Sequence, residues 1–323
     1  MAISENLRIT LKVCRLYYED NLSQKEISAK LGISRPQISR ILSYAKENHI
    51  VTININNPYS NESVLEEKLV KIYGLTDAIV INTDGVKNTE QSMAFAEKAA
   101  NDLESFFFDG NHVGVMSGKT VSNIVQNIRW NNKRNLEFIP LVGGIGPVMG
   151  SFHANVIAAL WAQITMGNSA VLNVPFIVKN EKSCEILKRE PEIENILKKG
   201  SLCDVALVGI GQIDVESTTA QAGALDSSDI KVLKAQGAMA SVCNSYLDKN
   251  GKLIKASIMK RSIGVSLDQM KGCRIIAAAR GISKTKAIDA ALRSGYIDVL
   301  ITDTETAHLI LENNKDNEGG VIK

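Results

Sequence analysis

The 323-residue sequence has no run of about 18 apolar residues, the length that a membrane-spanning helix requires. Its first ten residues, MAISENLRIT, also lack the charged-then-apolar pattern of a signal peptide. We therefore expect a cytoplasmic protein with no membrane partner. Hydrophobic residues make up 45% of the chain and the mean hydropathy is −0.02, which is typical of globular proteins. The length allows one small module and one large domain.

Cysteine and histidine are few, and neither shows a metal-binding pattern. The five cysteines are odd in number and scattered, without a C-x-x-C pair: Cys14, Cys184, Cys203, Cys243 and Cys273. This spacing argues against a disulfide framework and a zinc site, so we expect each cysteine to be a small buried apolar residue. The four histidines are not spaced as metal ligands either. The sequence predicts no metal and no cofactor.

Residues 22–51 have the pattern of two short helices joined by a tight turn. Ser23 and Glu26 match a capping box, in which each side chain bonds the backbone N–H of the other residue. A helix therefore begins there. Gly32 provides the left-handed residue that ends this helix. The spacing predicts a helix-turn-helix, and a solvated helical hairpin is the competing interpretation.

The second helix of this pair has two chemically different faces. Ser34 caps the helix, and Pro36 lies in its first turn, where a missing N–H costs nothing. Apolar residues at helical spacing are expected to face a core: Ile38, Ile41, Leu42 and Ala45. The predicted DNA-binding residues are Ser34, Arg35, Gln37, Ser39 and Arg40. We expect Arg35 and Arg40 to make most of the contacts, and Gln37 and Ser39 to read bases.

We predict a DNA-binding domain over residues 1–57 and an effector-binding and oligomerisation domain over residues 58–323. An amphipathic helix over residues 5–20 completes the module, and the alternation in residues 51–56 predicts a strand that forms a wing. The module has eight lysines and arginines against five acidic residues, a net charge of +3. Because +3 is modest for binding phosphates, we expect a homodimer or homotetramer on double-stranded operator DNA.

From residue 76 onward, short apolar strands alternate with longer amphipathic helices. This alternation predicts an α/β domain with a parallel sheet covered on both faces. Residues 237–254 instead read as a strand pair turned at Asn250-Gly251. The expected parallel strands lie at residues 77–81, 112–117, 136–142, 170–174, 204–211, 273–280 and 297–302.

Glycine-rich loops follow several of these strands, and ligands of parallel sheets bind at such strand ends. Residues 117–120, Ser-Gly-Lys-Thr, open a helix, so backbone N–H groups, a lysine and a hydroxyl converge where an anion can bind. An ATP-binding P-loop needs a glycine where Val113 stands, and the loop at 143–146 lacks the dinucleotide glycine at Met149. Residues 280–284 form a second cationic loop, for which a solvated helix start is the alternative.

The order of these features resembles the SorC/DeoR-type bacterial transcriptional regulators, and the resemblance runs over nearly the whole chain. It rests on VGVMSGKTVSNIV, PLVGGIG, DVALVGIGQID, LDKNGKLI and residues 281–303. It implies a winged helix-turn-helix followed by a Rossmann-like α/β effector domain similar to the sugar-phosphate isomerase and deaminase fold. It also implies a regulator of a carbohydrate-utilisation operon whose operator binding is controlled by a sugar phosphate.

The resemblance assigns residues to the effector site. It implies that Lys119 and Thr120 hold the phosphate of a sugar phosphate and that Lys284 serves the same purpose. The full predicted set is Ser117, Gly118, Lys119, Thr120, Gly143, Gly144, Gln221 and Lys284. Val142 stands where some members have a basic residue, which argues against a bisphosphate or imine-forming ligand. Ser241 stands where an acidic residue is usual.

An isomerase or deaminase on the same fold is the competing class of function. Such an enzyme needs a carboxylate or imidazole placed against a substrate proton. The strand-end loops contain few of these groups, and the two obvious acids, Asp84 and Asp303, fit helix or turn caps. The sequence therefore predicts a regulator and not an enzyme. An unphosphorylated sugar or polyol remains the alternative effector.

Overall fold

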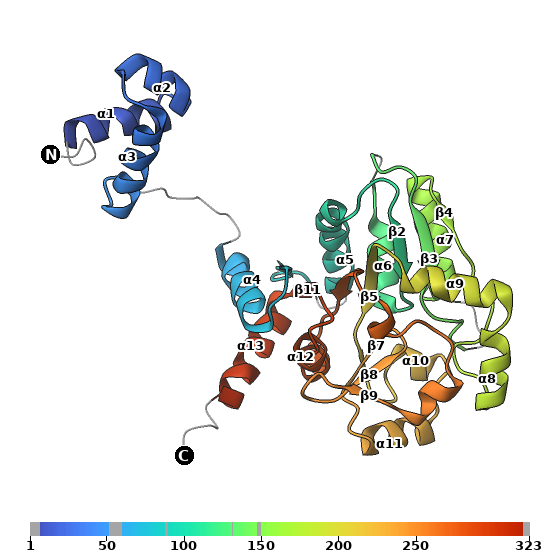
Figure 1. Cartoon of the computed structure of the whole chain (residues 1–323). Coiled ribbons are helices and arrows are strands. Elements are labelled where there is room, and N and C mark those ends of the chain that lie inside the picture. The colour runs from blue at the N-terminus through green and yellow to red at the C-terminus, as the bar shows by residue number, and fades with distance from the viewer. Residues whose placement is uncertain (1–6, 52–59, 88–89, 131, 147–149, 319–323) are drawn as a thin grey trace. The chain divides into compact units, whose positions relative to one another are not determined.

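We describe the protein from a computed structural model, which covers residues 7–51, 60–87, 90–130, 132–146 and 150–318. The chain divides into two compact units, residues 1–58 and 59–323, which are labelled by element in Figure 1. The predicted wing falls almost entirely on residues outside this description. None of the helices within these ranges is long and apolar enough to cross a lipid bilayer.

Residues 7–51 of the N-terminal unit form three helices around a small apolar core. They are α1 (Leu7–Tyr18), α2 (Gln24–Leu31) and α3 (Arg35–Glu47). Val13 and Ile27 are completely buried in this core. The four α3 residues predicted to face it are at most 6% exposed: Ile38, Ile41, Leu42 and Ala45. The expected division of α3 into an apolar and a polar face is confirmed.

Local hydrogen bonds fix the turn between α2 and α3. The Ser23 N–H donates to Glu26 Oε2 at 2.8 Å and the Glu26 N–H donates to Ser23 Oγ at 3.3 Å, which is the predicted capping box. Gly32 ends α2 with φ +67°, a conformation that costs a residue with a Cβ. Ser28 Oγ then donates to the carbonyl of Ile33 at 2.7 Å. The backbone path into α3 therefore depends on short-range contacts.

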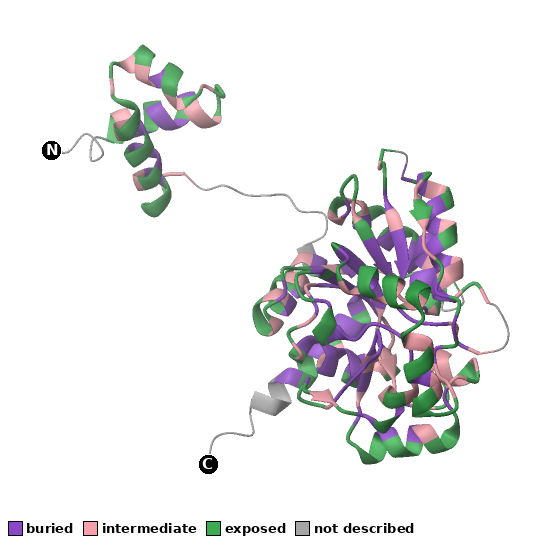
Figure 2. Ribbon diagram, turned by 45° about the vertical axis from the view of Figure 1, so that its right-hand side comes forward, coloured by how far each residue is buried: buried purple, intermediate pink, exposed green. Residues whose placement is uncertain are grey.

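The second unit is built on a seven-stranded parallel sheet of order β1-β11-β10-β5-β2-β3-β4. The predicted α/β class is confirmed. Side chains alternate between its faces. Val205 and Leu207 of β5 contact one core, and Ala206 and Val208 contact the other. Figure 2 shows buried residues gathered along these strands. The strands are β1 (Asp77–Ile81), β2 (His112–Val115), β3 (Glu137–Pro140), β4 (Asn168–Ser169), β5 (Val205–Gly209), β10 (Arg274–Ala278) and β11 (Val299–Asp303).

Helices cover both faces of this sheet. Apolar side chains of α5, α6 and α7 form one core with it, whereas those of α4, α12 and α13 belong to the other. The helices are α4 (Ser60–Tyr73), α5 (Gln91–Asp102), α6 (Lys119–Asn127), α7 (Ala154–Thr165), α8 (Glu181–Lys188), α9 (Pro191–Ser201), α10 (Thr218–Gln221), α11 (Ser227–Ala235), α12 (Thr285–Arg293) and α13 (Thr304–Glu318). Short 3-10 turns are η2 (Leu103–Phe106), η3 (Ser257–Arg261), η4 (Leu267–Gln269) and η5 (Ile282–Lys284).

A second, antiparallel sheet has the order β6-β7-β8-β9. Its strands are β6 (Gly211–Gln212), β7 (Ala240–Val242), β8 (Ser245–Leu247) and β9 (Leu253–Ile254). Gly251 takes φ +82° in the predicted turn between β8 and β9. The expectation of a single strand pair is wrong, because Cys243 adopts φ +52° and makes an additional turn between β7 and β8. A left-handed cysteine carries no sequence signal of a turn.

The strand predicted at residues 170–174 does not form. The last strand of the sheet is β4, which ends at Ser169. Asn155 accepts the Leu172 N–H at 2.9 Å and donates to the Leu172 carbonyl at 3.1 Å. A side chain therefore satisfies the backbone groups that would otherwise pair with a neighbouring strand.

Candidate functional site

The polar face of α3 carries the predicted DNA-binding residues. Ser34, Arg35, Ser39 and Arg40 are exposed, and Gln37 is half-buried. The ion pairs found in the described part of the chain leave both arginines out. Their guanidinium groups are therefore available to bind phosphate oxygens or guanine edges.

Gln37 has a structural task in addition to the predicted one. Its Oε1 accepts hydrogen bonds from Ser34 Oγ at 3.0 Å and from the Ser34 N–H at 3.4 Å, so it completes a second capping box. Its carbonyl oxygen is thus engaged at the start of α3. Only the amide nitrogen of Gln37 is left to donate to a base while this cap is intact.

The start of α6 forms one wall of the candidate ligand site. Gly118 precedes the helix with φ +151°, and its N–H donates to the Phe152 carbonyl at 2.9 Å. In the described structure no side chain caps α6. The first backbone N–H groups of the helix, which lie beside Ser117 and Thr120, are therefore free to bind an anion.

Three strand ends bring cations and amides together beside α6. Lys119 Nζ donates to Gln221 Oε1 at 2.9 Å, which joins two predicted residues that are 102 positions apart. Lys284 is the last residue of η5, which follows β10. Burial lowers the pKa of Lys284, the charge of Lys119 lowers it further, and Asp214 opposes both effects. A partly buried ammonium group beside a second cation is stabilised by an anion.

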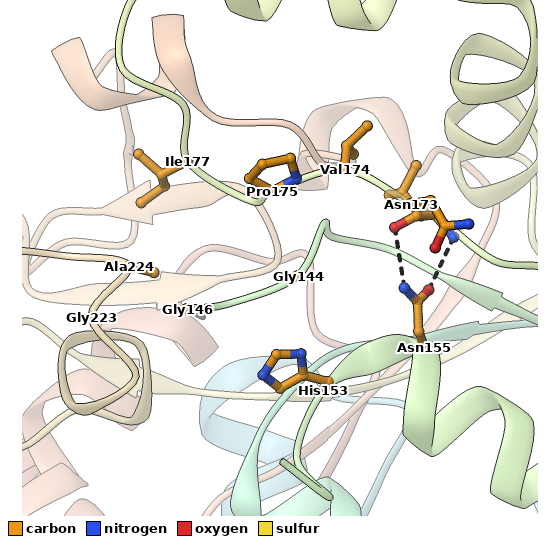
Figure 3. Close-up of a pocket in the computed structure, with 11 residues that line it drawn as sticks. Gly144, Gly146, His153, Asn155, Asn173, Val174, Pro175, Ile177, Gly223 and Ala224 are labelled. Atoms are coloured by element: carbon orange, nitrogen blue, oxygen red, sulfur yellow. Dashed lines mark hydrogen bonds between the residues drawn. The ribbon is translucent and has the colours of Figure 1, made fainter. Parts of the chain in front are cut away.

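A cavity of about 580 Å³ lies at the glycine turn that follows β3 (Figure 3). The Gly144 N–H donates to the Val174 carbonyl and the Phe176 N–H donates to the Gly144 carbonyl, each at 2.8 Å. A Cβ atom on Gly143 would lie 2.6 Å from the Val174 carbonyl oxygen, so only glycine fits there. The cavity is lined by Gly144, Gly146, His153, Asn155, Leu172, Asn173, Val174, Pro175, Ile177, Gly223 and Ala224.

His153 is a polar cavity residue that the sequence did not single out. Its ring lies beside the turn of Gly144 and Gly146 in Figure 3. The side chain is 6% exposed, and Nε2 has no hydrogen-bond partner in the described structure. A buried imidazole nitrogen without a partner costs free energy, which a ligand hydroxyl would recover. Asn155 was also missed, and the signal was the His-Ala-Asn at the start of α7.

The cation group and the cavity are connected through two segments of the chain. Phe152, whose carbonyl accepts the Gly118 N–H, directly precedes His153. Gln221, which binds Lys119, is followed closely by Gly223 and Ala224 of the cavity wall.

Arg280 lies in a smaller cavity of about 150 Å³ beside Lys119 and Thr120. Its Nε donates to Asp303 Oδ2 at 2.6 Å, and NH1 donates to Ser92 Oγ at 3.0 Å. Asp303 Oδ1 also accepts the Thr306 N–H at 2.8 Å. The expectation that Asp303 is a cap is confirmed, because both carboxylate oxygens are engaged in local structure.

A helix-turn-helix with a polar outer face, joined to an α/β unit with a strand-end ligand site, defines a ligand-responsive DNA-binding regulator. Comparison with known proteins gives the family. Residues 57–312 match the family model described as "Putative sugar-binding domain", and residues 11–48 match "Sigma-70, region 4", a helix-turn-helix region. The chain belongs to the SorC/DeoR-type sugar-binding transcriptional regulators, as the sequence predicted.

Individual relatives support this membership. The sorbitol operon regulator of Klebsiella pneumoniae is 29% identical over 97% of this chain and 100% of its own length. The deoxyribonucleoside regulator of Bacillus subtilis is 28% identical over 96% of this chain and 99% of its own. The crystal structure of the full-length Klebsiella regulator SorC matches with a TM-score of 0.73, covering 95% of this chain and 99% of that one. These relatives are regulators, which confirms the predicted class over an isomerase or deaminase.

Proposed function

We propose that this protein regulates a carbohydrate-utilisation operon and that a phosphorylated sugar is the effector that controls its binding to operator DNA. The observation that carries the proposal is the convergence of Lys119, Gln221 and Lys284 at the uncapped start of α6. Two ammonium groups and helix-terminal N–H groups hold a dianion well. The proposed domains are residues 1–57 for DNA and 58–323 for effector binding and oligomerisation.

The adjoining cavity supports a sugar as the rest of the effector. Among the described residues, His153 Nε2 has no hydrogen-bond partner, and Asn155 and Asn173 line the same cavity. A cavity of about 580 Å³ is within the usual range for small-molecule sites. In this arrangement the phosphate binds at α6 and Lys284, and hydroxyl groups point toward His153. Gly144 lines the cavity without a side chain, so a ligand can approach the backbone there, and Gly143 allows residues 174–176 to pack against this turn.

Calorimetry with pentose and hexose phosphates, each compared with its unphosphorylated sugar or polyol, tests this assignment. Lys119→Ala and Lys284→Ala should each weaken binding of the phosphorylated form by about 10- to 150-fold, the cost of one charged hydrogen bond. Lys286→Ala is the matched control, because Lys286 is exposed on α12. Equal binding of the unphosphorylated compound, with no effect of either lysine, would identify a neutral sugar or polyol as the effector instead.

The effector can control the operator only by binding the free and DNA-bound states unequally. The proposed site is formed by loops after β2, β3, β5 and β10, so a bound effector contacts the ends of several strands at once. We expect the effector to change operator affinity by about 5- to 150-fold, the usual range of such coupling. Fluorescence anisotropy with labelled operator, with and without the bound sugar phosphate, measures this factor.

The working species in this proposal is a homodimer or homotetramer. Residues 1–57 carry a net charge of only +3, and one such module makes few phosphate contacts. Two-fold pairing places two recognition helices about 34 Å apart, one turn of DNA, or at multiples of that distance. Analytical ultracentrifugation with and without operator is the test, and a monomer under both conditions would contradict the proposal.

A further inference from the structure

Two cysteines that are 70 positions apart meet at the amino ends of two neighbouring strands. Cys203 Sγ and Cys273 Sγ are 3.3 Å apart and share a hydrogen bond. Cys273 directly precedes Arg274, the first residue of β10, and Arg274 is paired with Val205 of β5. Because β5 and β10 are adjacent in the sheet, their backbone hydrogen bonds hold the two sulfur atoms in place.

The pair is enclosed, but one of its sulfur atoms borders a cavity. Cys203 is 3% exposed and Cys273 is 8% exposed. Cys273 lines a cavity of about 490 Å³ together with polar residues that include Asn111 and Arg274. A molecule as small as hydrogen peroxide fits this space. The effector site lies at the opposite, carboxyl ends of the same strands.

The surroundings lower the pKa of one of the two thiols. The hydrogen bond from Cys273 lowers the pKa of Cys203, as does one from the Gly114 backbone, against the opposing effect of burial. Cys273 accordingly keeps its proton. Cys243 lies in the same apolar core, and burial raises its pKa, so it stays a thiol as well. Thiolate character decides which cysteines react with peroxides.

We propose that Cys203 and Cys273 form an oxidisable dithiol that hydrogen peroxide converts to a disulfide and that a thiol reductant restores. The anionic sulfur attacks the O–O bond, which forms an S–OH group and releases hydroxide. The second sulfur then attacks the S–OH sulfur, so that the S–S bond forms and water leaves with the remaining thiol proton. The sulfur atoms approach from 3.3 Å to about 2.05 Å. The short approach means that both strands keep their pairing.

Oxidation of the folded full-length protein with hydrogen peroxide tests this proposal. Remaining thiols are blocked and peptides are analysed by mass spectrometry without reduction. We expect a peptide pair linked through Cys203 and Cys273, a mass loss of about 2 Da, and recovery of both thiols with dithiothreitol. Either Cys203→Ala or Cys273→Ala should abolish the link, whereas Cys184→Ala should leave it unchanged. Circular dichroism confirms that each variant is folded, and Cys→Ser versions serve if an alanine variant is not.

Two results would overturn the proposal. One is that Cys203 and Cys273 stay reduced, or reach sulfinic acid without linking, at peroxide levels that oxidise Cys14 or Cys184. The other is that the link forms only in denaturant. Neither outcome depends on the identity of the effector, because the dithiol proposal uses no residue of the effector site.

Discussion

Replacing Lys284 with methionine should stabilise the protein while it weakens the effector complex. Burial lowers the pKa of Lys284 from its ordinary value of 10.5, and nearby Lys119 adds to this effect. The charged form of Lys284 is therefore a cost to the unliganded fold. A methionine keeps the length and packing of the lysine stem and removes the charge, so it relieves that cost.

The sign of the pH dependence follows from proton binding. Between the lowered folded pKa and 10.5, the unfolded chain binds more protons at this position than the folded chain does. The free energy of unfolding of the wild type therefore rises with pH in that window, by about 1.4 kcal/mol for each unit of pKa lowering. Below this pH range Lys284 is protonated in both states, and the full free-energy cost of placing its charge in the fold is present. Lys284→Met should remove this rise and be more stable than the wild type at neutral pH.

Urea unfolding followed by tryptophan fluorescence measures this effect. The two tryptophans, Trp130 and Trp161, are both buried in the second unit, so the signal reports on the unit that holds Lys284. Lys286→Met is the control for the same charge change at an exposed position. Calorimetry should show a sugar phosphate binding about 10- to 150-fold more weakly to Lys284→Met. A variant that is less stable at neutral pH, with an unchanged alkaline slope, would refute the reasoning.

Three further substitutions test the two units separately. Arg40→Ala should weaken operator binding by about 1–3 kcal/mol in anisotropy titrations at fixed salt, and unchanged affinity would remove Arg40 from the contact surface. Ser23→Ala breaks the capping box of α2. It should lower the free energy of unfolding of the helix-turn-helix unit by about 0.5–2 kcal/mol, measured by thermal unfolding followed by circular dichroism. Gly143→Ala places a Cβ 2.6 Å from the Val174 carbonyl oxygen, so effector binding should be lost while the fold remains, and normal binding would contradict the cavity geometry.

The helix-turn-helix could be predicted well from the sequence because its signals are local. The Ser23 and Glu26 cap, the left-handed Gly32 and the buried face of α3 all depend on residues fewer than eight positions apart. The capping role of Gln37 was not predicted, although its signal is also local. An amide three residues after a serine at a helix start can cap the helix or contact a base, and both uses share one sequence pattern.

The strand-end loops of the effector unit could also be predicted, since parallel strands place their carboxyl ends at one edge of the sheet. The alternation of strands and helices placed the loops of Lys119 and Lys284 at that edge, whereas Gln221 was predicted only through the family resemblance. The strand order was not predicted, because it depends on pairings between distant segments. The contact between Cys203 and Cys273 also depends on the strand order, and it could not be predicted from their spacing in the sequence.

The residues missed at the site share one cause, which is that their roles depend on a long-range backbone contact. Asn155 bonds the N–H and the carbonyl of Leu172, and this holds residues 172–177 away from the sheet and against Gly143 and Gly144. Without these two hydrogen bonds, the apolar residues 170–174 could pair with the sheet as predicted. Residues 172–175 would then not line the cavity beside His153. The apolar pattern of residues 170–174 contains no information about an amide side chain 17 positions earlier. The error in predicting one strand and the failure to predict the cavity therefore have the same physical origin.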